Sequence, residues 1–479
     1  MIYQLSAISS QQSVLSYLSF PRKLESSSLT SSLSGLTGQS RTKVLDSPIK
    51  SGNDRKKLRR DDGKKGRNDY NFTVFNSSEA GFTLVELMIT MVIFLIVIAA
   101  ASGILTGMIT QFKQQSKIAE TNIEGIVGLD IMRWDIEHAG YGLPWVLGGA
   151  AYSEALNDTA TTWNDQTFND GPPNNPQRGT CPDASPLICN PASSSNPPGA
   201  IRSGNGLAIN GSDVLVIKAV NVATNVASSK WTHLFTGNTV TKWNSSSERL
   251  VTSDRVIVLS PNTRTLIVNG ANFTTRYDAN TDPNPDRLMD AAFAPPDNTE
   301  TYVVYGITLK GDPVVTALTM PFNRADFYIK TPTANFPSRC ATGTGILYKG
   351  TISQNDGSNT PGAIGQELPL LDCVADMQVV YLNAGAYTAD ISALSAQQIR
   401  EQVREVRVYI LAHEGQYDRD FTFDLNSRNA GLTPSIACLT CIRVGEFGLG
   451  QDFDLSGITN WQNYRWKVYT IVVKPINLR

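Results

Sequence analysis

The stretch Gly81-Phe-Thr-Leu-Val-Glu-Leu-Met-Ile-Thr90 decides the fold, because it opens a long apolar segment of the chain. Residues 87–109 carry no charged side chain. As a helix they would be about 35 Å long, which is enough to cross the hydrocarbon core of a bilayer. Glu86 stands at the edge of this run, where an acid costs less free energy than at the centre of a membrane. The sequence therefore predicts a transmembrane helix over 87–109.

The helical pattern continues beyond the apolar run. No proline interrupts residues 111–138, and apolar side chains recur there in steps of three or four. The members of this row are Ile123, Ile126, Leu129, Met132 and Ile136. Helix stop signals follow at Gly140, Gly142 and Pro144. We therefore expect one long helix over 82–141, whose amphipathic second half packs against the domain that follows.

The first 81 residues differ in charge from the rest of the chain. They hold 13 Lys and Arg against 7 Asp and Glu, a net charge of +6, whereas residues 82–479 hold 28 against 36, a net charge of −8. Basic residues ahead of a span favour a cytoplasmic N-terminus. The acidic remainder is therefore predicted to lie outside the cytoplasm. Residues 1–81 are predicted to be a leader or upstream segment that is mostly disordered.

The remaining chain is predicted to be a loop followed by a β-rich domain. Residues 142–206 are rich in Pro, Asn and Ser and read as a loop or insertion. Within 207–479, short β-branched or aromatic runs occur at 214–220, 255–259, 302–305, 326–329 and 346–348. Three later runs alternate, each with one apolar face: Ala375, Met377, Val379 and Tyr381; Val406, Val408 and Ile410; Tyr464, Trp466, Val468 and Val472. The predicted fold class is α+β, a long N-terminal helix packed on a mainly antiparallel sheet.

The six cysteines are candidates for disulfides in an exported domain, although sequence alone does not choose among their pairings. They are Cys181, Cys189, Cys340, Cys373, Cys438 and Cys441. Cys438 and Cys441 also have the spacing of half a zinc site, but no second Cys-x-x-Cys follows, and His138, His233 and His413 lie elsewhere. Disulfides or unpaired thiols are favoured over zinc.

The sequence lacks the motifs of common enzymes. It contains no Gly-rich phosphate loop, no His-Glu-x-x-His pair and no Gly-x-Ser-x-Gly elbow. Asp278, Asp282 and Asp286 do not match the spacing of a calcium loop and are expected to be solvated loop acids, as are Asp452 and Asp454. The acidic body has no basic stripe for nucleic acid. We predict no catalytic residue, no metal site, no cofactor and no nucleic-acid partner.

The hexapeptide at 81–86, followed at once by the apolar run, resembles the processing site of type IV prepilins. The resemblance implies that a prepilin peptidase cuts between Gly81 and Phe82 and methylates the new N-terminus at Phe82. It also implies an assembly role for Glu86, which would meet the N-terminal amine of a neighbouring subunit. An amine and a carboxylate are each costly alone among apolar helices, so their pairing selects one stagger between subunits.

The leader departs from this family, whose leaders are short and basic. Here 81 residues precede the cut, and Glu79 lies two positions before Gly81. A translation start placed too far upstream would explain the length, because initiation at Val74 would leave a short leader.

Further segments resemble PilW-type minor pilins: residues 130–142 at the helix end, and 371–381, 403–409 and 464–470 in the carboxyl region. The resemblance implies a structural subunit that is anchored in the bacterial inner membrane by a single pass, with a periplasmic C-terminal domain, and then enters a pilus at the cell surface. The implied partners are the lipid bilayer before assembly, the prepilin peptidase, the inner-membrane assembly platform, and major and other minor pilins through the N-terminal helix.

Two other interpretations remain open. A pseudopilin of a type II secretion system would share the fold and the processing. An exported binding protein with a cleaved signal peptide is also compatible with the apolar run, since Ala99-Ala-Ala101 is a plausible cut site. The two types of cut predict mature chains that begin at Phe82 or at Ser102.

Overall fold

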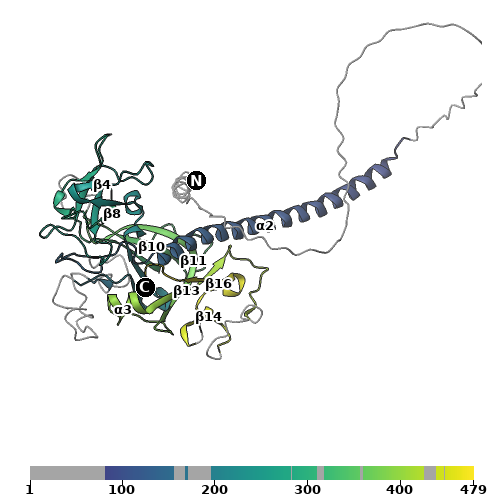
Figure 1. Cartoon of the computed structure of the whole chain (residues 1–479). Helices are drawn as coiled ribbons and strands as arrows, with labels where there is room; N and C mark the ends of the chain where they lie inside the picture. The colour runs from purple at the N-terminus through teal and green to yellow at the C-terminus, as the bar shows by residue number, and fades with distance from the viewer. Residues whose placement is uncertain are drawn as a thin grey trace, which may run out of the picture. The chain divides into compact units, whose positions relative to one another are not determined.

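The computed structural model describes residues 81–155, 168–170, 196–281, 283–309, 318–355, 360–425, 438–446 and 448–478. The chain divides after Gly81 into two units, 1–81 and 82–479. The predicted leader, apart from Gly81, lies outside the described residues. The second unit, described below, contains the long helix and the β domain (Figure 1).

The helix α2 spans Leu84–Glu137 without interruption and is 54 residues long. It begins at the N-cap Thr83 and ends at the C-cap His138. Gly140, two residues further on, has a φ of +80°, a left-handed conformation that glycine adopts at low cost and that turns the chain away from the helix. The predicted single long helix is confirmed, and its stop signal acts where the sequence places it.

Among the described residues, the main sheet has eight strands in the order β1-β2-β9-β10-β11-β13-β16, with β12 paired to β11. Every pairing in this sheet is antiparallel. The strands are β1 Ile201–Gly204, β2 Val214–Ala219, β9 Asn323–Lys330, β10 Gly345–Ile352, β11 Ile364–Asn383, β12 Ala386–Thr388, β13 Val403–Glu414 and β16 Arg465–Val473. The predicted fold class, a long helix followed by a mainly antiparallel sheet, is confirmed.

A second sheet is built from residues 231–308, inside the region predicted as the β-rich domain. Its described strands run in the order β4-β3-β8-β5-β6-β7, and a separate hairpin pairs β14 with β15. The bounds are β3 Trp231–Phe235, β4 Thr239–Val240, β5 Arg255–Leu259, β6 Thr275–Asp278, β7 Arg287–Leu288, β8 Tyr302–Thr308, β14 Cys441–Glu446 and β15 Leu449–Asp454. The short helix α3 spans Ala396–Gln402. Single 3₁₀ turns occur at Ile209–Gly211, Val220–Val222, Val226–Ser229, Thr236–Asn238, Ala291–Phe293, Leu455–Gly457 and Trp461–Asn463.

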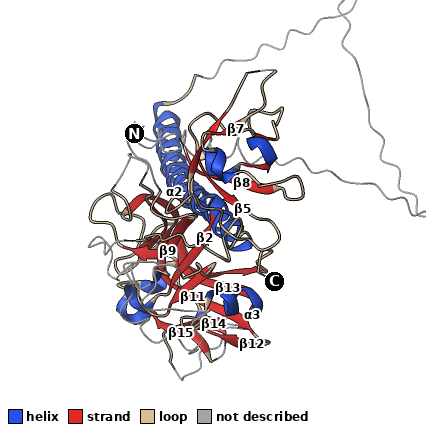
Figure 2. Ribbon diagram, turned by 60° about the vertical axis from the view of Figure 1, so that its left-hand side comes forward, coloured by secondary structure: helices blue, strands red, loops and turns tan. Residues whose placement is uncertain are grey.

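The second half of α2 packs on the main sheet, chiefly on β11, with β13 and β16 beside it (Figure 2). Leu129, Met132 and Ile136 are buried at this contact, as predicted. Ile123 and Ile126 are instead 64% and 61% exposed, so the predicted row is wrong at its start. A step of three residues covers only about 300° of helix, so repeated steps of three turn a row steadily off the buried face.

Two glycines occupy the contact positions that the predicted row misses. Gly125 and Gly128 are buried, and a Cβ on Gly128 would lie 1.9 Å from the carbonyl oxygen of Leu370 in β11. The missing side chain therefore lets the two backbones approach closely. Two turns further along α2, Asp135 Oδ2 lies 2.5 Å from Lys349 Nζ of β10, with both side chains buried. This ion pair fixes which face of α2 meets the sheet.

Both faces of the main sheet are covered. Val408 and Ile410 of β13 belong to the cluster that contains the buried residues of α2, whereas Leu411 belongs to a second cluster with the β14–β15 hairpin. Trp466 of β16 lies in the second cluster, and Ile471 of the same strand lies in the first. Helix α2 was the expected cover of the apolar face formed by Tyr464, Trp466, Val468 and Val472. That expectation is wrong, because Tyr464, Trp466 and Val468 pack in the hairpin-side cluster and Val472 is 48% exposed.

An irregularity in β11 explains a further error. Ala375 and Met377 were expected on one face, but Ala375 packs in the hairpin-side cluster and Met377 in the helix-side cluster. The pairing of β11 with β13 shifts register between Val374 and Asp376. One extra residue in a strand reverses the alternation of its side chains.

The segment predicted as a loop, 142–206, contributes to the core. β1 lies inside it and pairs with β2, so the sheet begins before the expected boundary at 207. Leu143, Leu147 and Tyr152 are buried in the cluster that contains α2. Of this segment, residues 156–167 and 171–195 lie outside the described residues.

Candidate functional site

The bond between Gly81 and Phe82 lies ahead of the first turn of α2. Gly81, Phe82 and Thr83 precede the helical hydrogen bonds, and Phe82 is 82% exposed. Apart from its neighbours in the chain, no described residue has an atom within 4 Å of the place where a side chain on Gly81 would begin. Exposed stretches with small residues are the preferred places for proteolysis. The predicted processing position is therefore open to an enzyme.

Glu86 is held in the first turn of α2 by Thr83. The backbone N–H of Thr83 and its hydroxyl each donate to Glu86 Oε2 at 3.0 Å, and the backbone N–H of Glu86 donates to Thr83 Oγ1 at 3.3 Å. This capping box satisfies N–H groups that have no partner within the helix, and it places a negative charge at the positive end of the helix dipole. The Thr-x-x-Glu spacing of the sequence is a signal for this box.

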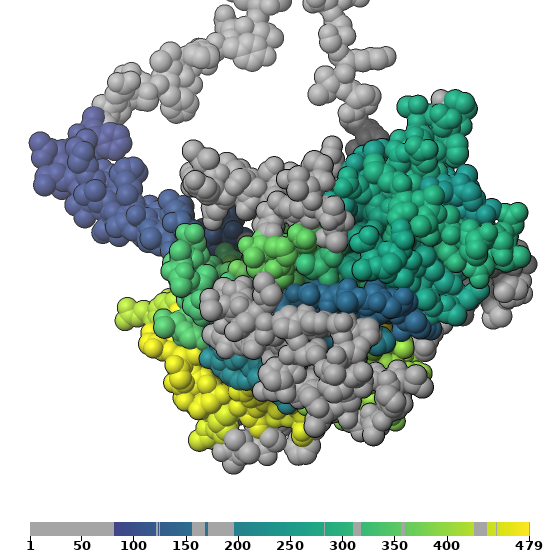
Figure 3. Space-filling model, turned by 90° about the vertical axis from the view of Figure 1, so that its left-hand side faces the viewer, coloured from purple at the N-terminus to yellow at the C-terminus, as the bar shows by residue number. Residues whose placement is uncertain are grey.

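The apolar run 87–109 is exposed along its whole length. Among the described residues, α2 is the one helix long and apolar enough to cross a membrane, with a mean hydropathy of 2.8 in a window that nothing covers. Figure 3 shows this half of the helix, in purple, projecting free of the β domain. An exposed apolar surface of this extent marks contact with a membrane or with other apolar segments. Together with its place in the chain, it indicates membrane anchoring.

Four of the six candidate cysteines form two disulfides. Cys340, in the segment before β10, bonds to Cys373 of β11, and Cys438 bonds to Cys441 at the start of β14. Cys181 and Cys189 lie outside the described residues.

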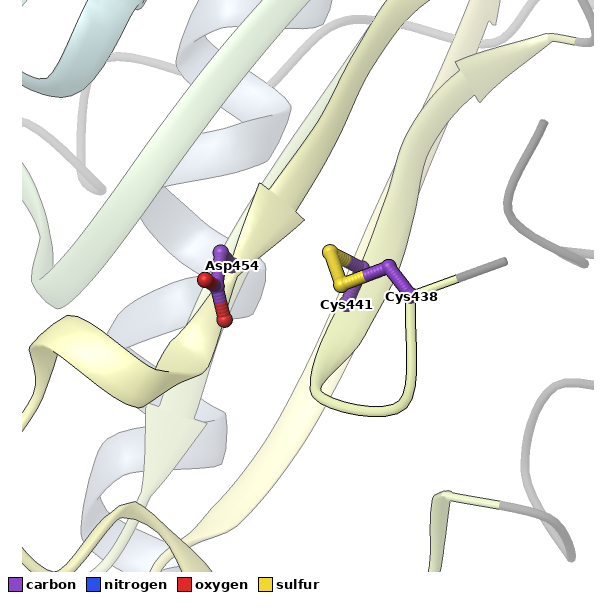
Figure 4. Close-up of side chains that lie close together, drawn as sticks. All are labelled: Cys438, Cys441 and Asp454. Atoms are coloured by element: carbon purple, nitrogen blue, oxygen red, sulfur yellow. A yellow bond between two sulfur atoms is a disulfide. The ribbon is translucent and has the colours of Figure 1, made fainter. Parts of the chain in front are cut away.

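Cys438, Cys441 and Asp454 form the one group of three possible metal ligands among the described residues, with ligand atoms within 4.8 Å of one another (Figure 4). Asp454 faces Cys441 directly across the β14–β15 pair. The disulfide consumes both thiols, so the thiolates that zinc requires are missing in this form. Asp454 Oδ1 accepts hydrogen bonds from the Thr440 hydroxyl at 2.6 Å and from the Ser456 N–H at 2.9 Å, which lower the pKa of this carboxyl. The disulfide and these hydrogen bonds therefore stabilise the end of the β14–β15 hairpin.

Two of the three acids considered for calcium, Asp278 and Asp286, are paired with arginines. Asp286 is fully buried, with Oδ1 2.6 Å from Arg249 Nη2 and Oδ2 accepting the Tyr277 hydroxyl at 2.7 Å. Asp278 pairs with Arg287 at 2.9 Å. Asp282 lies outside the described residues. The expectation of solvated loop acids is wrong for Asp286, because a buried carboxylate needs the charged and hydrogen-bonding partners that it has here. It is also wrong for Asp452, which lies in β15 and pairs with Arg443 at 2.9 Å.

A buried cluster of alternating charges lies between the segment after α2 and the strands β1, β2 and β9. Its members are Glu154, Asp170, Arg202, Lys218, Arg324 and Asp326. Lys218 Nζ lies 2.6 Å from Glu154 and 2.7 Å from Asp170. Arg202 also pairs with Asp170. Three cations and three carboxylates balance each other, so the cluster fastens the segment to the sheet, and the sequence offers no periodic signal for it.

The most buried histidine of the three is structural. Nε2 of His413 accepts the backbone N–H of Ala341 at 2.9 Å. Burial, reinforced by the positive charge of Arg339, lowers the pKa of His413 to about 3. The ring is therefore neutral at physiological pH and holds the segment that carries Cys340.

Comparison with known proteins identifies one family signature. Residues 76–102 match the prokaryotic N-terminal methylation motif, a span that includes Gly81, Phe82 and Glu86. No curated protein matches the chain. A search of solved structures finds the type IV-like pilin TTHA1219 from Thermus thermophilus, with 14% identity and a TM-score of 0.18, over 48% of this chain and 88% of that one. A likeness that weak carries no argument about fold. The chain thus has a prepilin-type N-terminal methylation motif at the head of one long helix, followed by a mainly antiparallel β domain, and these features support a pilin or pseudopilin role.

Proposed function

We propose that this chain is a structural subunit of a type IV pilus, a PilW-like minor pilin without catalytic activity. The observation that carries the proposal is the methylation motif at 76–102, placed at the head of a helix whose apolar half is uncovered and whose other half packs on the sheet. Such a helix can lie in lipid first and among other apolar helices later. The motif and fold support a type II secretion pseudopilin equally, and the resemblance of residues 130–142 to PilW-type helix ends favours the minor pilin.

Processing is the first step of this function. A prepilin peptidase would cut after Gly81 and methylate Phe82, leaving α2 intact as the stem of the mature protein. The test is N-terminal sequencing and intact mass of the chain produced together with a prepilin peptidase. We expect a mature chain that begins with N-methylated Phe82, and no processing of Gly81→Leu. A mature chain that begins at Ser102 would show instead that residues before it act as a signal peptide.

Assembly is the second step, and it assigns a further role to Glu86. Its carboxylate would pair with the N-terminal amine of a neighbouring mature subunit and so select the stagger between helices. Glu86→Gln removes the charge but keeps an oxygen that can accept from Thr83. We expect normal membrane insertion and reduced incorporation into filaments, measured by immunoblots of sheared pili against the membrane fraction.

Thr83→Val is the matched control, because it removes the hydroxyl of the capping box and leaves the charge of Glu86. If capping alone explained the importance of Glu86, Thr83→Val would lose incorporation, whereas Glu86→Gln, which keeps an acceptor oxygen for the cap, would enter filaments nearly as the wild type does. If pairing between subunits explains it, Thr83→Val should still enter filaments while Glu86→Gln should not.

The location and partners follow from the same steps. We propose a single-pass protein of the bacterial inner membrane with its β domain in the periplasm, which passes through the assembly platform into the pilus beside major and other minor pilins. The bilayer holds the exposed run 87–109 before assembly, and neighbouring helices replace the lipid afterwards.

A further inference from the structure

Two arginines from distant parts of the chain lie on the indole ring of Trp145. Cζ of Arg264 is 5.3 Å from the ring centroid, and Cζ of Arg400 is 5.0 Å from it, both within the range of cation–π contact. Trp145 follows the end of α2, Arg264 lies in the turn after β5, and Arg400 belongs to α3. Three separate elements therefore bring two permanent positive charges to one aromatic ring.

Neither guanidinium has a carboxylate partner among the described residues. The arginines that do form ion pairs in the described β domain are Arg202, Arg249, Arg287, Arg324, Arg339, Arg407, Arg443 and Arg465. Nη1 of Arg400 is buried and has no hydrogen-bond acceptor. A buried donor without an acceptor is destabilising, more so when it is charged. Among the described residues, Glu401 acts on Arg400 as an opposing charge but forms no ion pair with it, so both guanidiniums can accept an anionic partner.

The charges and titratable groups that interact with Arg264 and Arg400 also favour a ligand that accepts hydrogen bonds. Burial lowers the pKa of Arg400, and the positive charge of Arg264 lowers it further, against the opposing charge of Glu401. Tyr141 and Tyr305 lie edge to face with their ring centroids 5.5 Å apart, and burial raises the pKa of both phenols, so they remain neutral. Guanidinium and phenol groups both donate hydrogen bonds. The two cations and the neutral phenols that interact with Arg264 favour a ligand that supplies acceptor oxygens.

The backbone at Arg264 is held in an unusual conformation. Its φ is +50°, in the left-handed region that side chains other than glycine seldom adopt and that occurs often at ligand sites. The carbonyl oxygen of Arg264 accepts the backbone N–H of Trp145 at 2.9 Å. The same turn that strains Arg264 therefore fastens it to the residue whose ring it covers.

We infer that Arg264, Arg400 and Trp145 form a binding site for a small oxyanion, a phosphate or a carboxylate. The planar fork of arginine donates two parallel hydrogen bonds to either group, and the indole lies within cation–π distance of both guanidiniums. The helical stretch from Ile109 to Glu137 places about 42 Å between the end of the apolar run and this region of the chain. A free anion in the aqueous compartment therefore fits better than a lipid headgroup.

The test measures anion binding to the full-length chain in detergent by isothermal titration calorimetry. Sodium phosphate and sodium citrate are compared with sodium chloride at equal ionic strength, and the more effective anion identifies the ligand class. We expect saturable binding of phosphate or citrate. Arg264→Gln and Arg400→Gln should each weaken it at least about tenfold, since each removes a charge-assisted hydrogen-bond donor. Arg400→Lys, which keeps the charge and loses the fork, should bind with intermediate affinity.

Arg404→Gln is the matched control. Arg404 lies one turn from Arg400, and its guanidinium already donates to the backbone carbonyls of Arg400 and Glu401, so anion binding should be unchanged. Thermal unfolding in chloride alone shows whether each variant is folded. If Arg400→Gln unfolds, Arg264→Gln, whose substitution lies in a surface turn, still tests the site. The inference is overturned if neither anion binds saturably to the wild-type chain, or if a folded Arg264 variant binds as the wild type does.

Discussion

Gly128→Ala is a direct test of the close approach between α2 and the main sheet. The added Cβ would lie 1.9 Å from the carbonyl oxygen, 2.6 Å from the carbonyl carbon and 2.8 Å from the Cα of Leu370. All three are backbone atoms of β11, so no side chain can rotate out of the way. A carbon–oxygen contact needs roughly 3.3 Å, so α2 must move away from β11 by about 1.4 Å.

The cost of that movement follows from the side chains at the contact. A gap of about 1 Å forfeits up to half of the dispersion energy across it, and burial of each of Leu129, Met132 and Ile136 is worth about 2 kcal/mol. Half of that total is about 3 kcal/mol of lost stability. The better helix propensity of alanine offsets at most about 1 kcal/mol of this loss. The net loss is about 2 kcal/mol, a drop in Tm of roughly 4 °C.

Thermal unfolding of the full-length protein in detergent, followed by circular dichroism, measures the effect. Gly125→Ala is the matched control, because its Cβ would come close to the end of the Leu371 side chain, at 3.1 Å, which can rotate. The Tyr469 hydroxyl, at 3.8 Å, is at an ordinary contact distance. That variant should keep or raise the Tm. If Gly128→Ala melts no lower than Gly125→Ala, the two backbones do not approach as the structure shows, and the reasoning fails.

Three further predictions concern buried groups of the β domain, each read from the Tm. Burial raises the pKa of Asp376 from its ordinary 3.8 to about 7, so its contribution to stability is complete below about pH 4 and is lost as the pH rises through 7. Asp376→Asn should therefore lose less stability than the wild type between pH 5 and pH 8, and an identical pH profile would contradict this. Lys349→Met leaves Asp135 buried without its partner and should lower the stability by about 3–5 kcal/mol. Adding Asp135→Leu should restore part of that stability. If Lys349→Met alone were as stable as the wild type, the buried ion pair would be refuted. Cys340→Ser opens the bond to Cys373, which spans 33 positions, and should cost about 4 kcal/mol; an unchanged Tm under non-reducing conditions would show that the bond is not formed.

The sequence predicts the helix and most of the main sheet because their signals are local. The absence of charge over 87–109 and the row Leu129, Met132 and Ile136 are periodic properties of single elements. The apolar runs at β5, β9 and β13 identify strands in the same way. The period of the side chains along a helix or strand can be read from that segment alone, without knowing which elements pack against it. These elements therefore form where the sequence predicts them.

The errors occur where two elements meet. Ile123 and Ile126 are as apolar as the residues that are buried, and only the position of β11 decides that Gly125 and Gly128 face it instead. Trp466 alternates correctly in β16, but which face of the strand lies under α2 depends on a hairpin that is distant in sequence. The partners of Asp135, of Lys218 and of the cysteines are equally non-local, so spacing alone does not select them.

Glu86 shows how a local signal and an assembly signal can occupy one residue. In the single chain its carboxylate is used by the N–H and hydroxyl of Thr83, a cap worth about 0.5–2 kcal/mol. Cleavage after Gly81 would create a charged amine at Phe82, one residue from that cap, so the chain's own terminus and a neighbour's terminus would compete for the same acid. The free energy of pairing between subunits must then exceed that of the capping box and that of pairing with the chain's own terminus. This is possible only where apolar helices exclude water and strengthen the attraction. Under the proposed assembly role, the capping box would hold the acid in the free subunit and assembly would exchange it for the amine of a neighbouring subunit. We therefore expect Thr83→Val and Glu86→Gln to differ in their effects on filament entry.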